Sequence, residues 1–292
     1  MLEANTGSVN AAANSGPTPG VSADITYIAR PGPGPVVVFL HGIGSNATSF
    51  APIFELLPPR FSLIAWNAPG YSGSAPLAMD WPLARNYADR LAQMLDGLDL
   101  GQVHIVGHSL GTLIATAFAR RFPKRLLSLT LAAAAKGYGV PRGGVLPEGV
   151  GNRLTELARL GPAVFAHARA GNLVHEPALH PDIVARVEAA MAQVNPDGYA
   201  QAVRMLASGD LPGDLARVAA RPGFIVGMQD RVTPIAQTRA AAQAWEAAQG
   251  IRPTITEIDQ AGHAVYLQRP GAFCSALLEH MGLATASKPE GT

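Results

Sequence analysis

The chain has 292 residues, 48% of them apolar and 15% charged, which suits one large domain with an insertion or two small domains and excludes extensive disorder. The formal net charge of +1, without a Lys/Arg-rich run, argues against a nucleic-acid partner. The single cysteine, Cys274, excludes an internal disulfide and a cysteine metal cluster, and we interpret it as a small apolar residue of a C-terminal helix.

Residues 1–22 are rich in Ala, Asn, Ser, Gly and Pro, and we expect them to form a disordered or loosely attached arm. They lack the basic and apolar regions of a signal peptide, and no stretch reaches the roughly 18 uninterrupted apolar residues of a membrane span. We therefore expect a soluble cytoplasmic protein without a membrane partner. The tail, residues 284–292, is expected to be disordered as well.

Six short runs of apolar and β-branched residues predict buried strands of a parallel sheet. Helical patterns lie between these runs. This alternation predicts an α/β fold with a doubly wound, mostly parallel sheet. The expected strands are residues 36–40, 62–66, 103–106, 127–131, 224–226 and 254–258, and the expected helices are 48–57, 82–98, 112–122, 234–249 and 270–281.

The alternation stops at residues 137–214, which begin with a run of glycines and prolines typical of a hinge. We expect this segment to be a helical cap inserted between two parts of the core, residues 23–136 and 215–283. It should cover the C-terminal edge of the sheet, where ligands of open α/β sheets bind. Its helical patterns are residues 151–160, 162–170, 181–194 and 196–207, and it contains no convincing strand pattern.

The sequence Gly-His-Ser-Leu-Gly at residues 107–111 lies between a predicted strand and a predicted helix. G-x-S-x-G in that setting is typical of a nucleophile elbow, a tight turn that lifts the serine hydroxyl above a parallel sheet. The glycines allow neighbouring backbone segments to approach closely. Ser109 is therefore the candidate nucleophile, and it requires an adjacent base.

Two other residues complete a predicted triad at the C-terminal ends of strands. Asp230 follows the penultimate predicted strand, and His263 follows the last one, so the chain order is Ser, Asp, His. In this arrangement His263 carries the proton, and Asp230 orients the imidazole and stabilises its charged form. Asp259, four residues before His263, is the rival acid, and we interpret it as the end of a strand.

An oxyanion hole requires two donors aimed at the developing negative charge. The backbone N–H of Leu110 lies at the start of the helix that follows Ser109. The turn His-Gly-Ile-Gly at residues 41–44 follows the first long strand. We expect the N–H of Leu110 and that of Ile43 to form this hole.

Five motifs together resemble the α/β-hydrolase superfamily over about residues 23–283, whereas the cap cannot be aligned by motif. Within it, the chain resembles the capped branch that holds small esterases, enol-lactonases, cofactor-free haloperoxidases and hydrolases that cleave carbon–carbon bonds. Haloalkane dehalogenases have Asp in place of Ser109, and many carbon–carbon hydrolases have Asn in place of His108, so ester or lactone substrates are favoured. The motifs occupy residues 41–44, 67–74, 107–111, 227–230 and 262–263.

The resulting hypothesis is a serine hydrolase that cleaves a small carboxylic ester or lactone through an acyl-serine intermediate. We expect no nucleotide cofactor, because no G-x-G-x-x-G follows a strand and no P-loop is present. Homo-oligomer formation is left open. We also expect no metal, because the remaining histidines lack metal-ligand spacing: His104, His167, His175, His180 and His280.

Two alternatives stay open. One is a hydrolase that cleaves a carbon–carbon bond of a vinylogous diketone acid, and the other is a ligand-binding protein of the same fold. Substrate identity depends on cap side chains, for which Met191 and Phe165 are the expected pocket residues. The first alternative requires a cation for the substrate carboxylate, and the cap offers Arg142, Arg169, Arg186 and Arg204.

Overall fold

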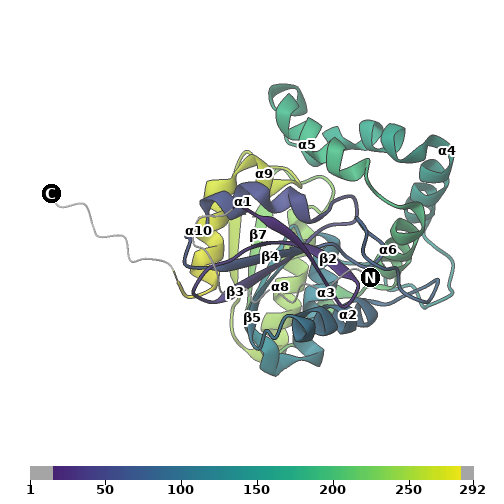
Figure 1. Ribbon diagram of the computed structural model, residues 1–292. Helices are drawn as coiled ribbons and strands as arrows, with labels where there is room; N and C mark the ends of the chain where they lie inside the picture. The colour runs from purple at the N-terminus through teal and green to yellow at the C-terminus, as the bar shows by residue number, and fades with distance from the viewer. Residues whose placement is uncertain (1–15, 284–292) are drawn as a thin grey trace, which may run out of the picture.

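The computed structural model describes residues 16–283, which contain one eight-stranded sheet (Figure 1). The spatial order is β1-β2-β4-β3-β5-β6-β7-β8; β3 to β8 are parallel, and β1 and β2 are antiparallel. The predicted α/β fold with a mostly parallel sheet is therefore confirmed. The strands are β1 (Thr18–Ser22), β2 (Ile25–Arg30), β3 (Val36–Leu40), β4 (Ser62–Trp66), β5 (Val103–His108), β6 (Leu126–Ala132), β7 (Pro222–Gly227) and β8 (Thr254–Ile258).

Helices cover both faces of the sheet. Helices α2, α3 and α8 pack on one face, and α1 and α10 pack together on the other (Figure 1). The helices are α1 (Ala51–Leu56), α2 (Ala84–Gly97), α3 (Leu110–Arg121), α4 (Glu148–Ala170), α5 (Pro181–Met191), α6 (Pro196–Ser208), α7 (Leu211–Leu215), α8 (Ile235–Gln249), α9 (Val265–Gln268) and α10 (Pro270–His280). Four 3₁₀ turns accompany them: η1 (Ala47–Phe50), η2 (Pro123–Arg125), η3 (Gly171–Leu173) and η4 (Pro177–Leu179).

The expected arm requires a correction, because residues 18–22 form β1 at the edge of the sheet and pair with β2. The strand is mostly exposed and so carries no apolar pattern. Its hairpin turn has positive φ at Ala23 and Asp24, where the usual sequence signal is Asn-Gly, so the turn was not recognisable either. Residues 1–15 of the expected arm, and the expected tail, lie outside the described residues.

Residues 137–214, which we call the cap, contain α4 to α6, all but the last residue of α7, and no strand of the sheet. An isolated bridge between Gly137 and Asp210 joins the two ends of the cap. Two expected helices are merged in α4, which kinks at Gly161 with φ 72° and ψ 163°, a conformation open only to glycine. The kinked α4 and helices α5 and α6 stand beside the core in Figure 1.

Two smaller observations concern the core and its surroundings. Cys274 is buried in α10, and burial raises the pKa of its thiol to about 12. Among residues 16–283, no helix has both the length and the apolar character needed to cross a membrane.

Candidate active site

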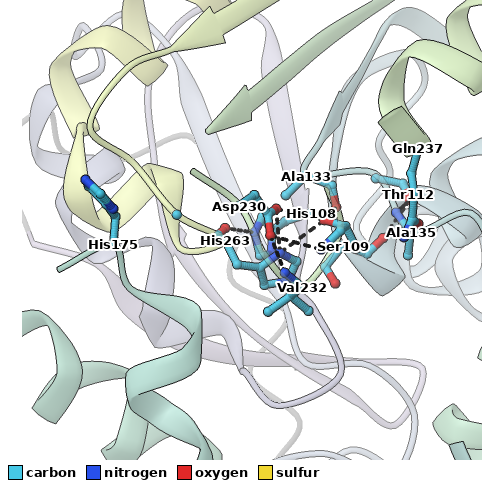
Figure 2. A network of polar contacts seen from close by, with 12 residues as sticks. His108, Ser109, Thr112, Ala133, Ala135, His175, Asp230, Val232, Gln237 and His263 are labelled. Atoms are coloured by element: carbon cyan, nitrogen blue, oxygen red, sulfur yellow. Dashed lines mark hydrogen bonds and ion pairs between the residues drawn. The ribbon is translucent and has the colours of Figure 1, made fainter. Parts of the chain in front are cut away.

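The parallel sheet brings three candidate residues to one edge. Ser109 directly follows β5, Asp230 follows β7, and His263 follows β8. Strands β5, β6, β7 and β8 are parallel neighbours, so their C-terminal ends meet at the same side. Figure 2 shows Ser109 and His108 beside Asp230 and His263.

Ser109 lies in a strained turn at the start of α3, with φ 52° and ψ −117°. Such a conformation costs a non-glycine residue about 1–3 kcal/mol, which the surrounding contacts must offset. The Ser109 N–H donates to the Ala132 carbonyl at 2.9 Å, and the Ser109 carbonyl accepts from the Thr112 hydroxyl at 2.6 Å. A Cβ at Gly111 would collide with the Leu40 carbonyl oxygen, so this position of the elbow requires glycine.

His263 and Asp230 form a buried pair, with 2.9 Å between Nδ1 of the imidazole and Oδ2 of the carboxylate. The other oxygen, Oδ1, accepts from the backbone N–H groups of Val232 at 2.8 Å and Thr233 at 2.9 Å. Burial alone would raise the pKa of Asp230, but the neighbouring His263 and the hydrogen bonds outweigh burial and hold the pKa below its ordinary value. The carboxylate is thus charged and fixed against the imidazole.

The rival acid lies elsewhere. Asp259 is exposed at the end of β8, and its carboxylate accepts from the Gln229 side chain at 2.8 Å. The structure therefore pairs His263 with Asp230 rather than with Asp259.

The two expected donors of the oxyanion hole both line the cavity that contains Ser109. Leu110 is the first residue of α3, where helical N–H groups have no intrahelical partner. Within residues 16–283, neither the Leu110 N–H nor the Ile43 N–H donates a hydrogen bond to another group. Both donors are thus available to a substrate oxygen.

The backbone that carries Ile43 is held by two buried side chains that the sequence analysis did not assign. The Tyr71 hydroxyl donates to the Ile43 carbonyl at 2.8 Å. His41 Nε2 accepts from the Ala68 N–H at 3.0 Å, so its Nδ1 carries the proton and donates to the Gly42 carbonyl at 2.8 Å. Burial lowers the pKa of His41 to about 4, so the ring is neutral. The sequence signal for these two side chains was that their motifs, residues 41–44 and 67–74, each directly follow a strand, and those strands, β3 and β4, are neighbours in the sheet.

His108, which precedes the nucleophile, is also buried. Its Nε2–H donates to the backbone carbonyl of His263 at 2.9 Å, and its ring packs against that of Tyr266 with 4.8 Å between centroids. Burial is the main cause that lowers the pKa of His108, to about 3. This neutral imidazole ties the loop of His263 to the elbow.

A cavity of about 810 Å³ lies between the sheet edge and the cap. This volume is in the range of sites for small organic ligands. Ser109 and His263 line it on the core side, and the cap contributes Phe165, Arg169 and Met191, whereas the expected Arg142, Arg186 and Arg204 do not line it. Further cap residues of the lining, not singled out from the sequence, include Arg153, Asn172, Val187 and Tyr199.

The cap also contacts the loop that carries His263. The Gln268 side chain accepts from the backbone N–H groups of Gly262 at 2.8 Å and His175 at 2.9 Å, and donates to the His175 carbonyl at 3.0 Å. The Ala264 N–H donates to the Leu173 carbonyl at 2.9 Å. The base loop is therefore held from the cap as well as from the core.

Comparisons with known proteins place the chain in a family. The model of the alpha/beta hydrolase family matches residues 37–276. An uncharacterized protein of Mycobacterium tuberculosis is 38% identical over 103 residues, which are 35% of this chain and only 30% of that protein. The pimeloyl-acyl-carrier-protein methyl ester esterase of Chromobacterium violaceum is 28% identical over 260 residues, 87% of this chain and 97% of that enzyme.

A solved structure, of a thermophilic esterase from Thermogutta terrifontis, superposes with a TM-score of 0.77 at 23% identity. The superposition covers 93% of this chain and 100% of that one. At this identity, the likeness establishes the fold.

Proposed function

Because the chain belongs to the alpha/beta hydrolase family, we propose that it is a serine hydrolase that cleaves a small carboxylic ester or lactone through an acyl-serine intermediate. The buried His263–Asp230 pair beside the strained Ser109 is the observation that carries this proposal. The similarity to a methyl ester esterase supports an ester as substrate.

In the first half of the proposed reaction, the Ser109 hydroxyl attacks the carbonyl carbon of the substrate. His263 accepts the hydroxyl proton at Nε2, while Asp230 holds Nδ1–H and stabilises the imidazolium. The carbonyl oxygen gains negative charge and is stabilised by the N–H groups of Ile43 and Leu110. His263 then protonates the alcohol oxygen, which leaves, and the acyl group stays on Ser109.

In the second half, water replaces the alcohol. His263 takes a proton from this water, which attacks the acyl carbon, and the same two N–H groups stabilise the second tetrahedral intermediate. Ser109 leaves with the proton from His263, and the carboxylic acid is released. Each proton transfer in this scheme is assigned to a side chain, and no metal or cofactor takes part.

Steady turnover of a panel of p-nitrophenyl esters tests the proposal. The wild-type protein should hydrolyse short-chain esters over many turnovers, and the rate should be the same in EDTA. An organophosphate that phosphorylates active serines should block turnover, lose its leaving group and add the mass of its phosphoryl group to the peptide that contains Ser109. A protein that binds these esters without turnover would instead be the ligand-binding alternative.

A further inference from the structure

The lining of the cavity carries more positive than negative charge. Among its lining residues Asp210 is the one carboxylate, and that carboxylate accepts a hydrogen bond from the Gly213 N–H at the start of α7. A cavity lined by an excess of one charge concentrates ligands of the opposite charge. The basic residues of the lining are Lys136, Arg153, Arg169 and Arg231.

Arg169 already has a counterion. Its Nη2 lies 2.5 Å from a carboxylate oxygen of Glu156, and its guanidinium stacks 4.8 Å above the centre of the Phe165 ring. Arg169 is therefore a positioned and largely compensated charge on the cap wall.

Arg153 lies on the same wall and lacks such a partner. It is half-buried, and among residues 16–283 no carboxylate lies within 4.0 Å of its guanidinium. Beside it lies the hydroxyl of Tyr199, which is buried against the edge of Phe165 with 5.6 Å between ring centroids. Arg153 and Tyr199 thus line the cavity together, and the nearby Glu156 carboxylate, which also interacts electrostatically with Arg153, pairs directly with Arg169.

The kink of α4 produces this arrangement. Arg153 belongs to the first half of the helix, and Phe165 and Arg169 belong to the second half. The conformation at Gly161 redirects the chain between the halves, so both contribute side chains to one cavity.

The cap wall adjoins the turn of residues 41–44, which carries the proposed donor Ile43 and which we call the oxyanion loop. Gly198, next to Tyr199, packs against Gly70 so closely that neither position has room for a Cβ. Gly70 directly precedes Tyr71, whose hydroxyl donates to the Ile43 carbonyl. Met191 of the cap also packs against Gly44 of the oxyanion loop.

We propose that Arg153 and Tyr199 form a subsite for a carboxylate carried by the substrate, so that the enzyme acts on half-esters of dicarboxylic acids or on carboxylate-bearing lactones. Arg153 is the half-buried cation of the lining without a carboxylate within 4.0 Å among residues 16–283, whereas Lys136 and Arg231 are exposed. Its planar fork matches the geometry of a carboxylate. This inference rests on the proposed function, because the subsite lies in the cavity that contains Ser109.

Two esters of equal chain length test the subsite: p-nitrophenyl hemiglutarate, which carries a carboxylate, and neutral p-nitrophenyl valerate. We expect wild-type kcat/KM to be at least about tenfold higher for the hemiglutarate, equivalent to about 1.4 kcal/mol. Arg153→Gln should lower this ratio about tenfold or more, Arg153→Lys less, and Tyr199→Phe severalfold. Equal kcat/KM for the two esters in the wild type, or an equal loss for both in Arg153→Gln, would overturn the proposal.

Arg159→Gln is the matched control, because Arg159 is exposed on the same helix and does not line the cavity. It should leave the ratio unchanged. High salt should lower the wild-type preference for the hemiglutarate, since screening weakens attraction between charges.

A binding measurement separates the subsite from the reaction. Monomethyl glutarate should bind to Ser109→Ala protein in a calorimeter, and adding Arg153→Gln should weaken binding at least about tenfold. If this holds while the wild type cleaves neither ester, the subsite stands and the proposed function fails. If Arg153→Gln leaves the Kd unchanged while valerate ester is cleaved, the function stands and the subsite is wrong.

Discussion

At the scale of single residues, Ser109 combines a strained backbone with a hydroxyl that faces the cavity. The strain is maintained by hydrogen bonds of its backbone to Ala132 and Thr112, none of which uses the serine side chain. The side chain is therefore free for chemistry, and its removal should leave the fold intact.

We predict that Ser109→Ala yields a folded protein that has lost nearly all esterase activity. The acyl intermediate cannot form without the hydroxyl, and loss of one member of a catalytic triad costs several orders of magnitude in kcat. Circular dichroism and initial rates with p-nitrophenyl butyrate check this. Retention of more than about a tenth of wild-type kcat, far above the residual activity of an oxyanion hole alone, would contradict the assignment of the nucleophile.

The acid assignment predicts unequal effects of two similar substitutions. Asp230→Asn should lower kcat strongly, because an amide favours the wrong imidazole tautomer; in serine protease triads the loss is about 10⁴-fold. Asp259→Asn should change kcat less than about threefold, since Asp259 bonds to Gln229 and not to His263. Steady-state kinetics of both variants measure the two losses of kcat. A larger loss in Asp259→Asn than in Asp230→Asn would show that Asp259 is the acid.

At the scale of elements, the cap helices form one wall of the cavity, and the sheet edge forms the other. We therefore expect their functions to be separable, with the proposed proton transfers at the sheet edge and selection of the substrate by size and charge at the cap. Met191, at the end of α5, shows this division, since it lines the cavity and packs against Gly44.

We predict that Met191→Ala shifts the preference of the enzyme toward longer acyl chains, because it enlarges the cavity beside the oxyanion loop. The ratio of kcat/KM for p-nitrophenyl octanoate to that for the butyrate should rise at least about threefold, a change of under 1 kcal/mol that removal of a few methylene-sized groups can supply. Val164→Ala, at an exposed cap position outside the cavity, serves as the control. If the ranking of acyl-chain lengths is unchanged in Met191→Ala, then Met191 of α5 does not determine the chain-length preference.

At the scale of the whole molecule, burial of neutral histidines couples stability to pH. Burial is the main cause that lowers the pKa of His41 and His280 to about 4 and of His108 to about 3. In the unfolded chain these groups take up protons near pH 6.5. Between about pH 6.5 and pH 4 the unfolded state therefore binds more protons, and the free energy of unfolding falls as the pH falls.

We predict that the free energy of unfolding decreases by about 4 kcal/mol per pH unit near pH 5 through these three histidines, the value for three extra protons bound by the unfolded state. His104, whose pKa is also lowered by burial, adds to this slope. Urea unfolding at pH 6.0, 5.5 and 5.0 measures this slope. His280→Gln, outside the candidate active site, should reduce the slope by about 1.4 kcal/mol per pH unit, the value for one proton. An identical slope in this variant would show that His280 is not kept neutral by burial.

Much of the core and the candidate site could be predicted from the sequence, because the relevant signals are local. Apolar runs such as residues 36–40 indicate buried parallel strands, whichever elements they pack against. Ser109, Asp230 and His263 each lie within five residues of a strand end. Parallel strands place those ends at one edge, so the convergence of the three side chains follows from the fold class.

Only the tertiary structure decided which groups meet across long separations in the chain. The edge strand β1 exists because it pairs with β2, not because of its own pattern. Tyr71 contacts Ile43, 28 residues away, and Arg153 comes beside Tyr199 through the packing of α4 against α6. Periodicity along the chain describes which face of an element is buried, whereas the partner of a buried polar group depends on packing between elements. For this reason the strand pattern and its motifs predicted the candidate triad and three cavity residues of the cap, Phe165, Arg169 and Met191, but not the pairing of Arg153 with Tyr199.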